Sequence, residues 1–180
     1  MELLKSRLVP SPLGPLLGVA SAHGICGLFF DGETAQGSFE KWRRKHAPTA
    51  RVEHADAHDP GLHGLEQQLG AYFAVERTRF ALPLDLRGTD FQCDVWQELR
   101  RVPFGATVAY GDLGERMGRS GASRAIGMAN GANPVPIIVP CHRVVSASGL
   151  GGFSGGIERK LFLLRHEGVL LPTDSQSLFN

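Results

Sequence analysis

Cys141 is the residue of this sequence best suited to chemistry, because His142 and Arg143 follow it directly. The thiolate is the nucleophilic form of cysteine, so a working nucleophile needs a base or a positive charge beside it, and these neighbours offer both. Adjacent side chains on an extended segment point to opposite sides, so we expect His142 to act through a bridging water. The alternative is an incidental Cys-His pair, which is common where no further motif surrounds it.

Two downstream features could complete a site around this cysteine. The Gly-Gly-Phe-Ser-Gly-Gly run at 151–156 predicts a loop that brings main-chain amides close to a bound group. Apolar spacing then predicts a helix that ends near Glu167, with Gly168 as its cap. Glu167 could orient His142 as a base, and the alternative is a solvated carboxylate at a helix end.

A helical segment must position these residues. Thr89 and Gln92 predict the start of a helix in which each side chain satisfies a free amide of the other residue. Pro103 to Gly105 ends that helix, and the branched apolar run at 137–139 predicts a buried strand just before the cysteine. The helix should bury one face, which consists of Phe91, Val95, Leu99 and Val102.

Two short helices, over 111–117 and 122–130, are predicted between these segments. With their glycine-containing turn they resemble a helix-turn-helix, and an ordinary helical hairpin is the alternative. The second helix consists largely of small residues, with Arg124 as its only charged side chain. Such a helix could lie in a groove, although close packing on a neighbouring helix would explain the small residues equally well.

The first third of the chain predicts a small sheet, from apolar runs at 2–10, 16–21 and 25–30 separated by Pro and Gly. Asp31-Gly32 should make a turn, and a helix fragment with a loop is expected over 33–60. A helix with a core-facing stripe is predicted over 62–73.

The fold class expected from these elements is α+β. A small N-terminal antiparallel sheet with helix should occupy 1–87, followed over 88–170 by a mainly helical domain containing the helix-turn-helix, with a tail at 171–180. The formal net charge of +1 points to no particular partner.

The spacing of the cysteines and the hydropathy pattern restrict the cellular compartment in which this protein could work. Three widely spaced cysteines without a CxxC pair argue against a disulfide framework and a compact zinc site, and favour a reducing compartment. The uncharged stretch 9–30 is interrupted by prolines and glycines, so we reject a signal peptide or a membrane span. We expect a cytoplasmic protein, or a nuclear one if the source is eukaryotic.

The cysteine lies in the run Asn-Pro-Val-Pro-Ile-Ile-Val-Pro-Cys-His-Arg-Val at 133–144. Four shorter motifs flank this run, namely Tyr-Gly-Asp-Leu (110–113), Arg-Ala-Ile-Gly (124–127), Ser-Gly-Gly (154–156) and His-Glu-Gly (166–168). By these motifs the segment 88–168 resembles the O6-alkylguanine-DNA alkyltransferases. Residues 1–87 match in general layout only.

The resemblance implies that Cys141 accepts an alkyl group from O6-alkylguanine. His142 would act through water as its base, Glu167 would orient His142, and Asn133 would hold the hinge before the active-site segment. Because a thioether is not undone by cellular thiols, the protein would act once per molecule.

Substrate and DNA contacts follow from the same resemblance. Tyr110, Phe153 and Ser154 would help bind a guanine flipped out of duplex DNA, and the carbonyls of Cys141 and Val144 would accept from its exocyclic amine. Arg124 would fill the vacated stack, with a phosphate contact as the alternative. The residues expected against DNA are Ser123, Arg124, Ala125 and Gly127.

One position departs from the family pattern, since Phe153 stands where the loop commonly carries an aromatic hydroxyl. Stacking can survive there, but a phenol hydrogen bond cannot. We expect no cofactor, no metal and no membrane partner. A monomer is expected, and cooperative binding along DNA and activity on O4-alkylthymine are left open.

Two rival functions remain. One is a binding module that recognises alkylated DNA without transfer, which the presence of Cys141 argues against. The other is a hydrolase with a Cys-His pair, which the surrounding DNA-recognition motifs disfavour.

Overall fold

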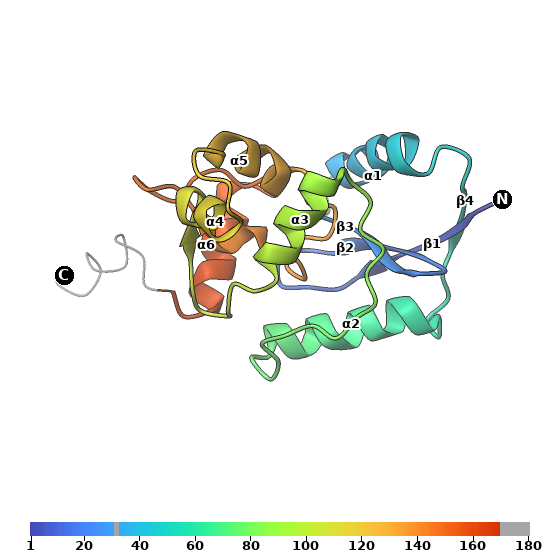
Figure 1. The fold of residues 1–180 in the computed structure, drawn as a ribbon. Coiled ribbons are helices and arrows are strands. Elements are labelled where there is room, and N and C mark those ends of the chain that lie inside the picture. Colours follow the sequence, from blue (N-terminus) through green and yellow to red (C-terminus); the bar gives the residue numbers. More distant parts are fainter. Residues whose placement is uncertain (31–32, 170–180) are drawn as a thin grey trace. The chain divides into compact units, whose positions relative to one another are not determined.

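The computed structural model describes residues 1–30 and 33–169, so the predicted Asp31-Gly32 turn and the tail lie outside it. The chain forms two compact units (Figure 1). The first comprises Met1–Cys93 and Pro134–Ile138, and the second comprises Asp94–Asn133 and the chain from Val139 onward. The domain boundary near Arg87 remains a prediction.

A four-stranded sheet in the order β3-β2-β1-β4 forms the centre of the first unit. The predicted strands are confirmed as β1 (Leu3–Val9), β2 (Leu16–Ser21) and β3 (Gly24–Phe30), which pair antiparallel. The sheet as a whole is mixed rather than antiparallel, because β4 (Arg51–His54) pairs parallel with β1. A helix connects β3 to β4, and such a crossover returns the chain in the same direction.

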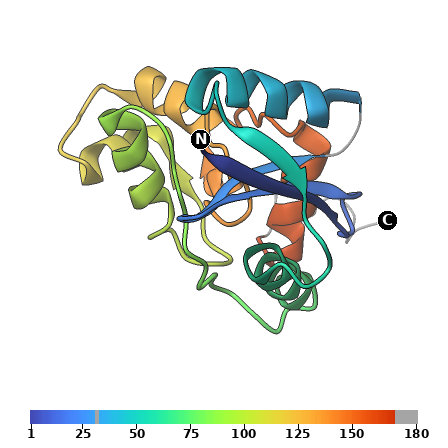
Figure 2. The same cartoon turned by 90° about the vertical axis from the view of Figure 1, so that its right-hand side faces the viewer.

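Two helices cover opposite faces of this sheet, α1 (Glu33–His46) on one and α2 (Pro60–Phe73) on the other (Figures 1 and 2). Gly18 lets α2 approach closely, since a Cβ at that position would meet Leu65 at 2.8 Å. The core on the α1 face contains Leu4, Val19, Cys26, Phe39, Trp42, Ala47 and Ala50.

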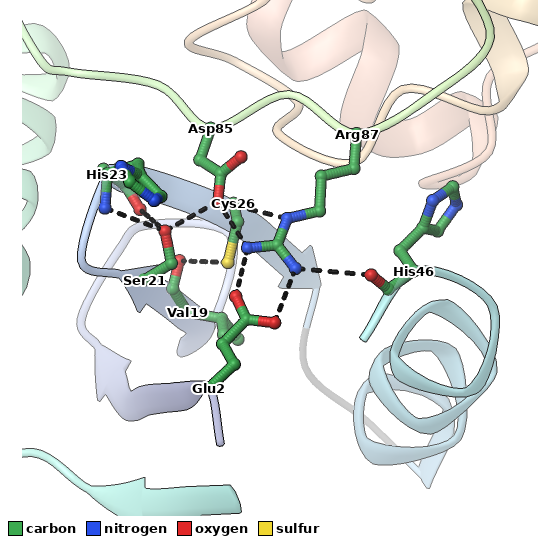
Figure 3. Close-up of polar contacts among 9 residues, drawn as sticks. Glu2, Val19, Ser21, His23, Cys26, His46, Asp85 and Arg87 are labelled. Atoms are coloured by element: carbon green, nitrogen blue, oxygen red, sulfur yellow. Dashed lines mark hydrogen bonds and ion pairs between the residues drawn. The ribbon is translucent and has the colours of Figure 1, made fainter. Parts of the chain in front are cut away.

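Arg87, the last residue of the predicted N-terminal domain, joins three segments of the first unit. Its guanidinium donates to the carboxylates of Glu2 and Asp85 and to the carbonyl of His46 (Figure 3). It also lies 5.7 Å from the ring centre of Trp42. We call Glu2, Asp85 and Arg87 the Arg87 cluster.

Helix α3 (Asp90–Leu99) begins as the sequence predicts. The Thr89 amide donates to Gln92 Oε1 at 3.0 Å, and the Gln92 amide donates to Thr89 Oγ1 at 3.3 Å, which is a reciprocal cap. Within the second unit, the Trp96 indole of this helix donates to the carbonyl of Ala129 at 2.9 Å.

The two turn-linked helices are confirmed as α4 (Tyr110–Arg116) and α5 (Ser123–Gly131). Gly118 and Gly121 adopt φ values of 65° and 80° in the turn between them. Gly114 permits their close packing, because a Cβ there would lie 3.1 Å from Ile126 Cδ1.

The remaining elements of the second unit are short. Two-residue strands β5 (Val108–Ala109) and β6 (Val144–Val145) pair parallel, and α6 (Ile157–His166) follows the glycine-rich loop. Across residues 1–30 and 33–169, none of the helices has the length and apolar composition of a bilayer span.

Candidate active site

Cys141 is 1% exposed and opens a single turn of 3-10 helix, η1 (Cys141–Arg143). The segment before it is buried as predicted, but the strand predicted over 137–139 is wrong. Ile137 has a φ of 73° and lies in a turn. Prolines at 134 and 136 have no amide hydrogen to donate, so this segment cannot complete a sheet ladder.

Asn133 stabilises this irregular segment. Its Nδ2 donates to the Val139 carbonyl at 2.7 Å and so closes the loop that precedes the cysteine. Burial raises the pKa of Cys141 to about 11, although a hydrogen bond from the Asn133 side chain lowers it. The thiol is therefore protonated at neutral pH and needs a base to react.

His142, the residue after the cysteine, forms a buried pair with Glu167. His142 Nε2 lies 2.8 Å from Glu167 Oε1, and both side chains are fully buried. Burial lowers the pKa of His142, and the hydrogen bond to Glu167 opposes that effect. The ring is therefore neutral, with Nε2 as the donor to Glu167. Nδ1 is buried and meets no hydrogen-bond partner among the described residues.

Arg143 holds the same carboxylate from another side. Its Nε donates to Glu167 Oε2 and its Nη2 to Oε1, both at 2.9 Å, while the Gly105 amide donates to Oε2 at 3.1 Å. Burial alone would raise the pKa of Glu167, but its bonds to His142 and Arg143 hold that pKa at about 2. The carboxylate is therefore ionised at neutral pH. We call Glu167, Arg143 and His142 the Glu167 cluster.

The end of α6 positions Glu167. The Gly168 amide donates to the Arg165 carbonyl and the Val169 amide to the Leu164 carbonyl, both at 2.9 Å, and Gly168 has a φ of 77°. These bonds form a Schellman motif, which confirms the predicted glycine cap. Glu167 is 4% exposed, so the alternative of a solvated carboxylate is wrong.

Lys160 is a buried cation that the sequence analysis missed. Its Nζ donates to the carbonyls of Val144, Leu150 and Gly152, at 2.6, 2.5 and 3.2 Å, and so ties the glycine-rich loop to β6. Burial lowers the pKa of Lys160 to about 8. The sequence did contain a signal for Lys160, because residues 157, 160, 164 and 167 lie on one face of a helix.

A pocket of about 210 Å³ lies within the second unit. It brings together four of the predicted residues, Tyr110, Gly127, Phe153 and Ser154. Asn130, which the sequence analysis did not select, also lines it and donates from Nδ2 to the Cys141 carbonyl at 3.3 Å. The fourth predicted substrate residue, Val144, is fully buried in β6. The pocket is smaller than the roughly 300–1,000 Å³ typical for drug-sized ligands and suits one flat ring system.

The residues predicted against DNA gather at the start of α5. Ser123, Arg124 and Ala125 are exposed there, while Gly127 is half-buried beside Tyr110. The structure therefore places a cation and small side chains on one accessible helix end.

Comparisons with known proteins identify the class as methyltransferases that act on DNA. Residues 90–169 match the DNA binding domain of 6-O-methylguanine DNA methyltransferase, and residues 4–86 match its ribonuclease-like domain. The chain belongs to the 6-O-methylguanine DNA methyltransferase family.

Individual relatives are similar over nearly their whole length. The methylated-DNA–protein-cysteine methyltransferase of Mycobacterium bovis is 43% identical, over 96% of this chain and 97% of the relative. That of Salmonella typhimurium is 41% identical, over 95% and 99%. The crystal structure of the Mycobacterium tuberculosis O6-methylguanine methyltransferase has a TM-score of 0.79 at 40% identity, covering 98% of this chain and 99% of that one.

Proposed function

We propose that this protein repairs DNA by direct reversal: it flips O6-alkylguanine out of the duplex and transfers the alkyl group to its own Cys141. The observation that carries this proposal is the buried His142–Glu167 pair next to the cysteine. Asn130 links that cysteine to the base-sized pocket through its bond to the Cys141 carbonyl.

His142 activates the thiol through a water molecule. Its Nδ1 is a buried acceptor without a protein partner among the described residues, which suits a water bridging to Cys141 Sγ. The Sγ proton passes through that water to Nδ1, and the ionised Glu167 stabilises the resulting imidazolium. Asn133 stabilises the thiolate by its hydrogen bond.

The thiolate then attacks the alkyl carbon. A carbon–sulfur bond forms, the bond between that carbon and O6 breaks, and its electron pair stays on the guanine. The guanine takes up one proton, which balances the proton lost by the thiol. Because the thioether is stable to thiols, each molecule reacts once and the alkylation is stoichiometric.

The second unit also offers the parts that base extrusion needs. The target carbon cannot meet a buried thiolate while the base is stacked, so the nucleotide must flip. Arg124 is exposed at the start of α5 and fills the vacated stack. Ser123, Ala125 and Gly127 let the helix lie close to the DNA backbone.

The pocket and its surroundings bind the flipped guanine. Tyr110, Phe153 and Ser154 line the pocket, and Lys160 holds the loop that carries the last two. The carbonyls of Cys141 and Val144 accept from the exocyclic amine. Duplex DNA is the proposed partner, and a Mycobacterium tuberculosis OGT at 39% identity has been solved in complex with DNA, with a TM-score of 0.75 over 99% of each chain.

The proposal is tested with duplex DNA that carries radiolabelled O6-methylguanine. We expect label on the protein, limited to one equivalent, and a methyl group on the peptide that contains Cys141. Binding of the DNA without label on the protein would support the rival binding module. Repeated release of a labelled small molecule would support a hydrolase.

A further inference from the structure

We propose that Lys160 is a positioning residue for base recognition: its ammonium holds one wall of the pocket in place through three carbonyls, and this wall loosens when the ammonium loses a proton. The inference rests on the proposed function. It goes beyond that function because it makes recognition of the base depend on the charge of a side chain that does not line the pocket.

The segment 150–152 is the part of the glycine-rich loop that leads into the pocket. It has no regular secondary structure, and no backbone–backbone hydrogen bond involves it among the described residues. Gly152 and the two residues after it line the pocket. Gly151 lies against Tyr110, since a Cβ there would meet the tyrosine ring at 3.2 Å. The segment therefore needs another anchor if it is to form a fixed wall.

Lys160 is that anchor. Its Nζ donates to the carbonyls of Leu150 and Gly152 at 2.5 and 3.2 Å, and to the carbonyl of Val144 at 2.6 Å. Because Val144 belongs to β6, which pairs with β5, these bonds tie the loop to a paired strand. The lysine side chain is fully buried. It therefore acts on a bound base through the loop and not by contact.

The number of hydrogens on the ammonium matches the number of carbonyls. An ammonium has three N–H donors and no acceptor, so all three carbonyls are satisfied. A neutral amine has two such donors, so one buried carbonyl would lose its partner. The two remaining bonds would also weaken, because hydrogen bonds from a charged donor are roughly twice as strong as neutral ones. Loss of one proton therefore releases part of the loop.

The surroundings of Lys160 favour that loss just above neutral pH. Among the described residues it forms no ion pair with a carboxylate, and burial lowers its pKa to about 8. The titratable groups around it are Cys141 and His142 of η1 and Tyr110 of α4, and burial keeps all three uncharged at neutral pH. Glu167 lies about 10 Å further along α6 and is engaged within the Glu167 cluster.

The test compares two reactions of Cys141 in the full chain. Transfer from the free base O6-benzylguanine requires the pocket, whereas methyl iodide is small enough to react without it. Mass spectrometry of the peptide that contains Cys141 gives both rate constants. We expect Lys160→Met to reduce the ratio of benzyl transfer to methyl iodide reaction by about ten- to a hundredfold, the range covered by hydrogen bonds from a charged donor.

Two results would overturn the positioning role. Equal slowing of both reactions in Lys160→Met would mean that the lysine acts on the thiol, and an unchanged ratio would mean that the loop does not need it. Lys45→Met is the matched control, because it makes the same substitution at an exposed position of α1 and should leave the ratio unaltered.

The ratio should also depend on pH. In wild type it should fall between about pH 7 and about pH 9.5, as the ammonium loses its proton, while in Lys160→Met it should start low and stay constant. Because both reactions consume the same thiolate, the ratio cancels the ionisation of the thiol. A constant wild-type ratio would overturn the proposal even if Lys160→Met did not fold. If wild type reacts with methyl iodide but accepts no alkyl group from O6-benzylguanine or from methylated DNA, the proposed function fails, independently of Lys160.

Discussion

The Arg87 cluster and the Glu167 cluster both pair an arginine with a carboxylate, but the two clusters differ in the number of carboxylates and in what else these bind. Arg87 is balanced by two carboxylates, Glu2 and Asp85, and the Ser21 hydroxyl donates to Asp85 at 2.6 Å (Figure 3). In the second unit one carboxylate, Glu167, is shared between Arg143 and His142. In the first arrangement both carboxylates are paired with the guanidinium, whereas the second leaves a histidine nitrogen without a partner among the described residues.

The cysteine near each cluster shows the consequence of that difference. Burial raises the pKa of Cys26 to about 12, and its Sγ donates to the Val19 carbonyl at 3.6 Å. Burial also raises the pKa of Cys141, but the residue that follows this cysteine, His142, is paired with Glu167. Burial and nearby charge are thus common to both, and an available base distinguishes the proposed nucleophile from a structural cysteine.

The largest effect is expected from the two cysteines themselves. Cys141→Ser should abolish methyl transfer while DNA binding persists, because the thiol supplies chemistry and not phosphate contacts. Cys26→Ser is the matched control and should retain transfer. Mass spectrometry of the protein after incubation with methylated DNA measures both. If the Cys141→Ser protein were methylated at the wild-type rate, Cys141 would not be the alkyl acceptor.

Glu167→Gln should reduce the single-turnover transfer rate by about 10²- to 10⁴-fold, because it removes the charge that stabilises protonated His142. Asp85→Asn makes the same change in the Arg87 cluster and should leave the rate unaltered. Equal rates for wild type and Glu167→Gln would leave Glu167 a structural role only.

The Glu167→Gln variant also tests a predicted pH dependence of stability. The pKa of Glu167 is about 2 in the folded protein, against an ordinary value of 4.5, so the ionised form stabilises the fold. That contribution is fully present above about pH 4.5 and is lost as the pH falls toward 2. The gap in unfolding free energy between wild type and Glu167→Gln should therefore narrow over this window in urea titrations. A constant gap would contradict the assignment.

Arg124→Ala should slow transfer from duplex DNA on the order of tenfold or more, since unstacking costs a few kcal/mol and the stand-in for the missing base is gone. Transfer from the free base O6-benzylguanine, which needs no flipping, should stay near wild type. The comparison uses single-turnover transfer rates of wild type and variant on both substrates, measured at saturating protein. Equal loss on both substrates would mean damage to the pocket, whereas rescue at high protein concentration would indicate a phosphate contact.

The smallest effect on chemistry is expected from Arg87→Met. It leaves two partly buried carboxylates without their cation, so the free energy of unfolding should fall by about 1–3 kcal/mol. The transfer rate per folded molecule should not change. A loss of rate at full folding would show that the two clusters do not differ as described.

The local features of this fold were predictable from the sequence. Thr89 with Gln92, and Gly168 after α6, are short-range signals, and the structure has both caps. The edge strand β4 was missed because its four residues, Arg-Val-Glu-His, include a single apolar residue. Edge strands often lack the alternation that identifies a strand.

The missed features of the site depend on contacts between distant segments. Lys160 is buried only because three carbonyls surround its ammonium, and Asn130 joins the site only through its bond to the Cys141 carbonyl and its place in the lining of the pocket. The turn at Ile137 replaces a strand because Asn133 bridges to Val139. None of these partners adjoins its residue in the sequence.

The burial of Cys141 also makes the repair event a change to the protein interior. Methylation adds a carbon at a side chain that is 1% exposed and removes the thiolate that Asn133 can stabilise. Inserting one carbon into a packed interior typically costs about 1–3 kcal/mol. For a chain of this size that lowers the melting temperature by about 2–4 °C per kcal/mol. The alkylated protein would thus resemble a variant with an overpacked core, and a thermal melt would distinguish it from the unreacted protein.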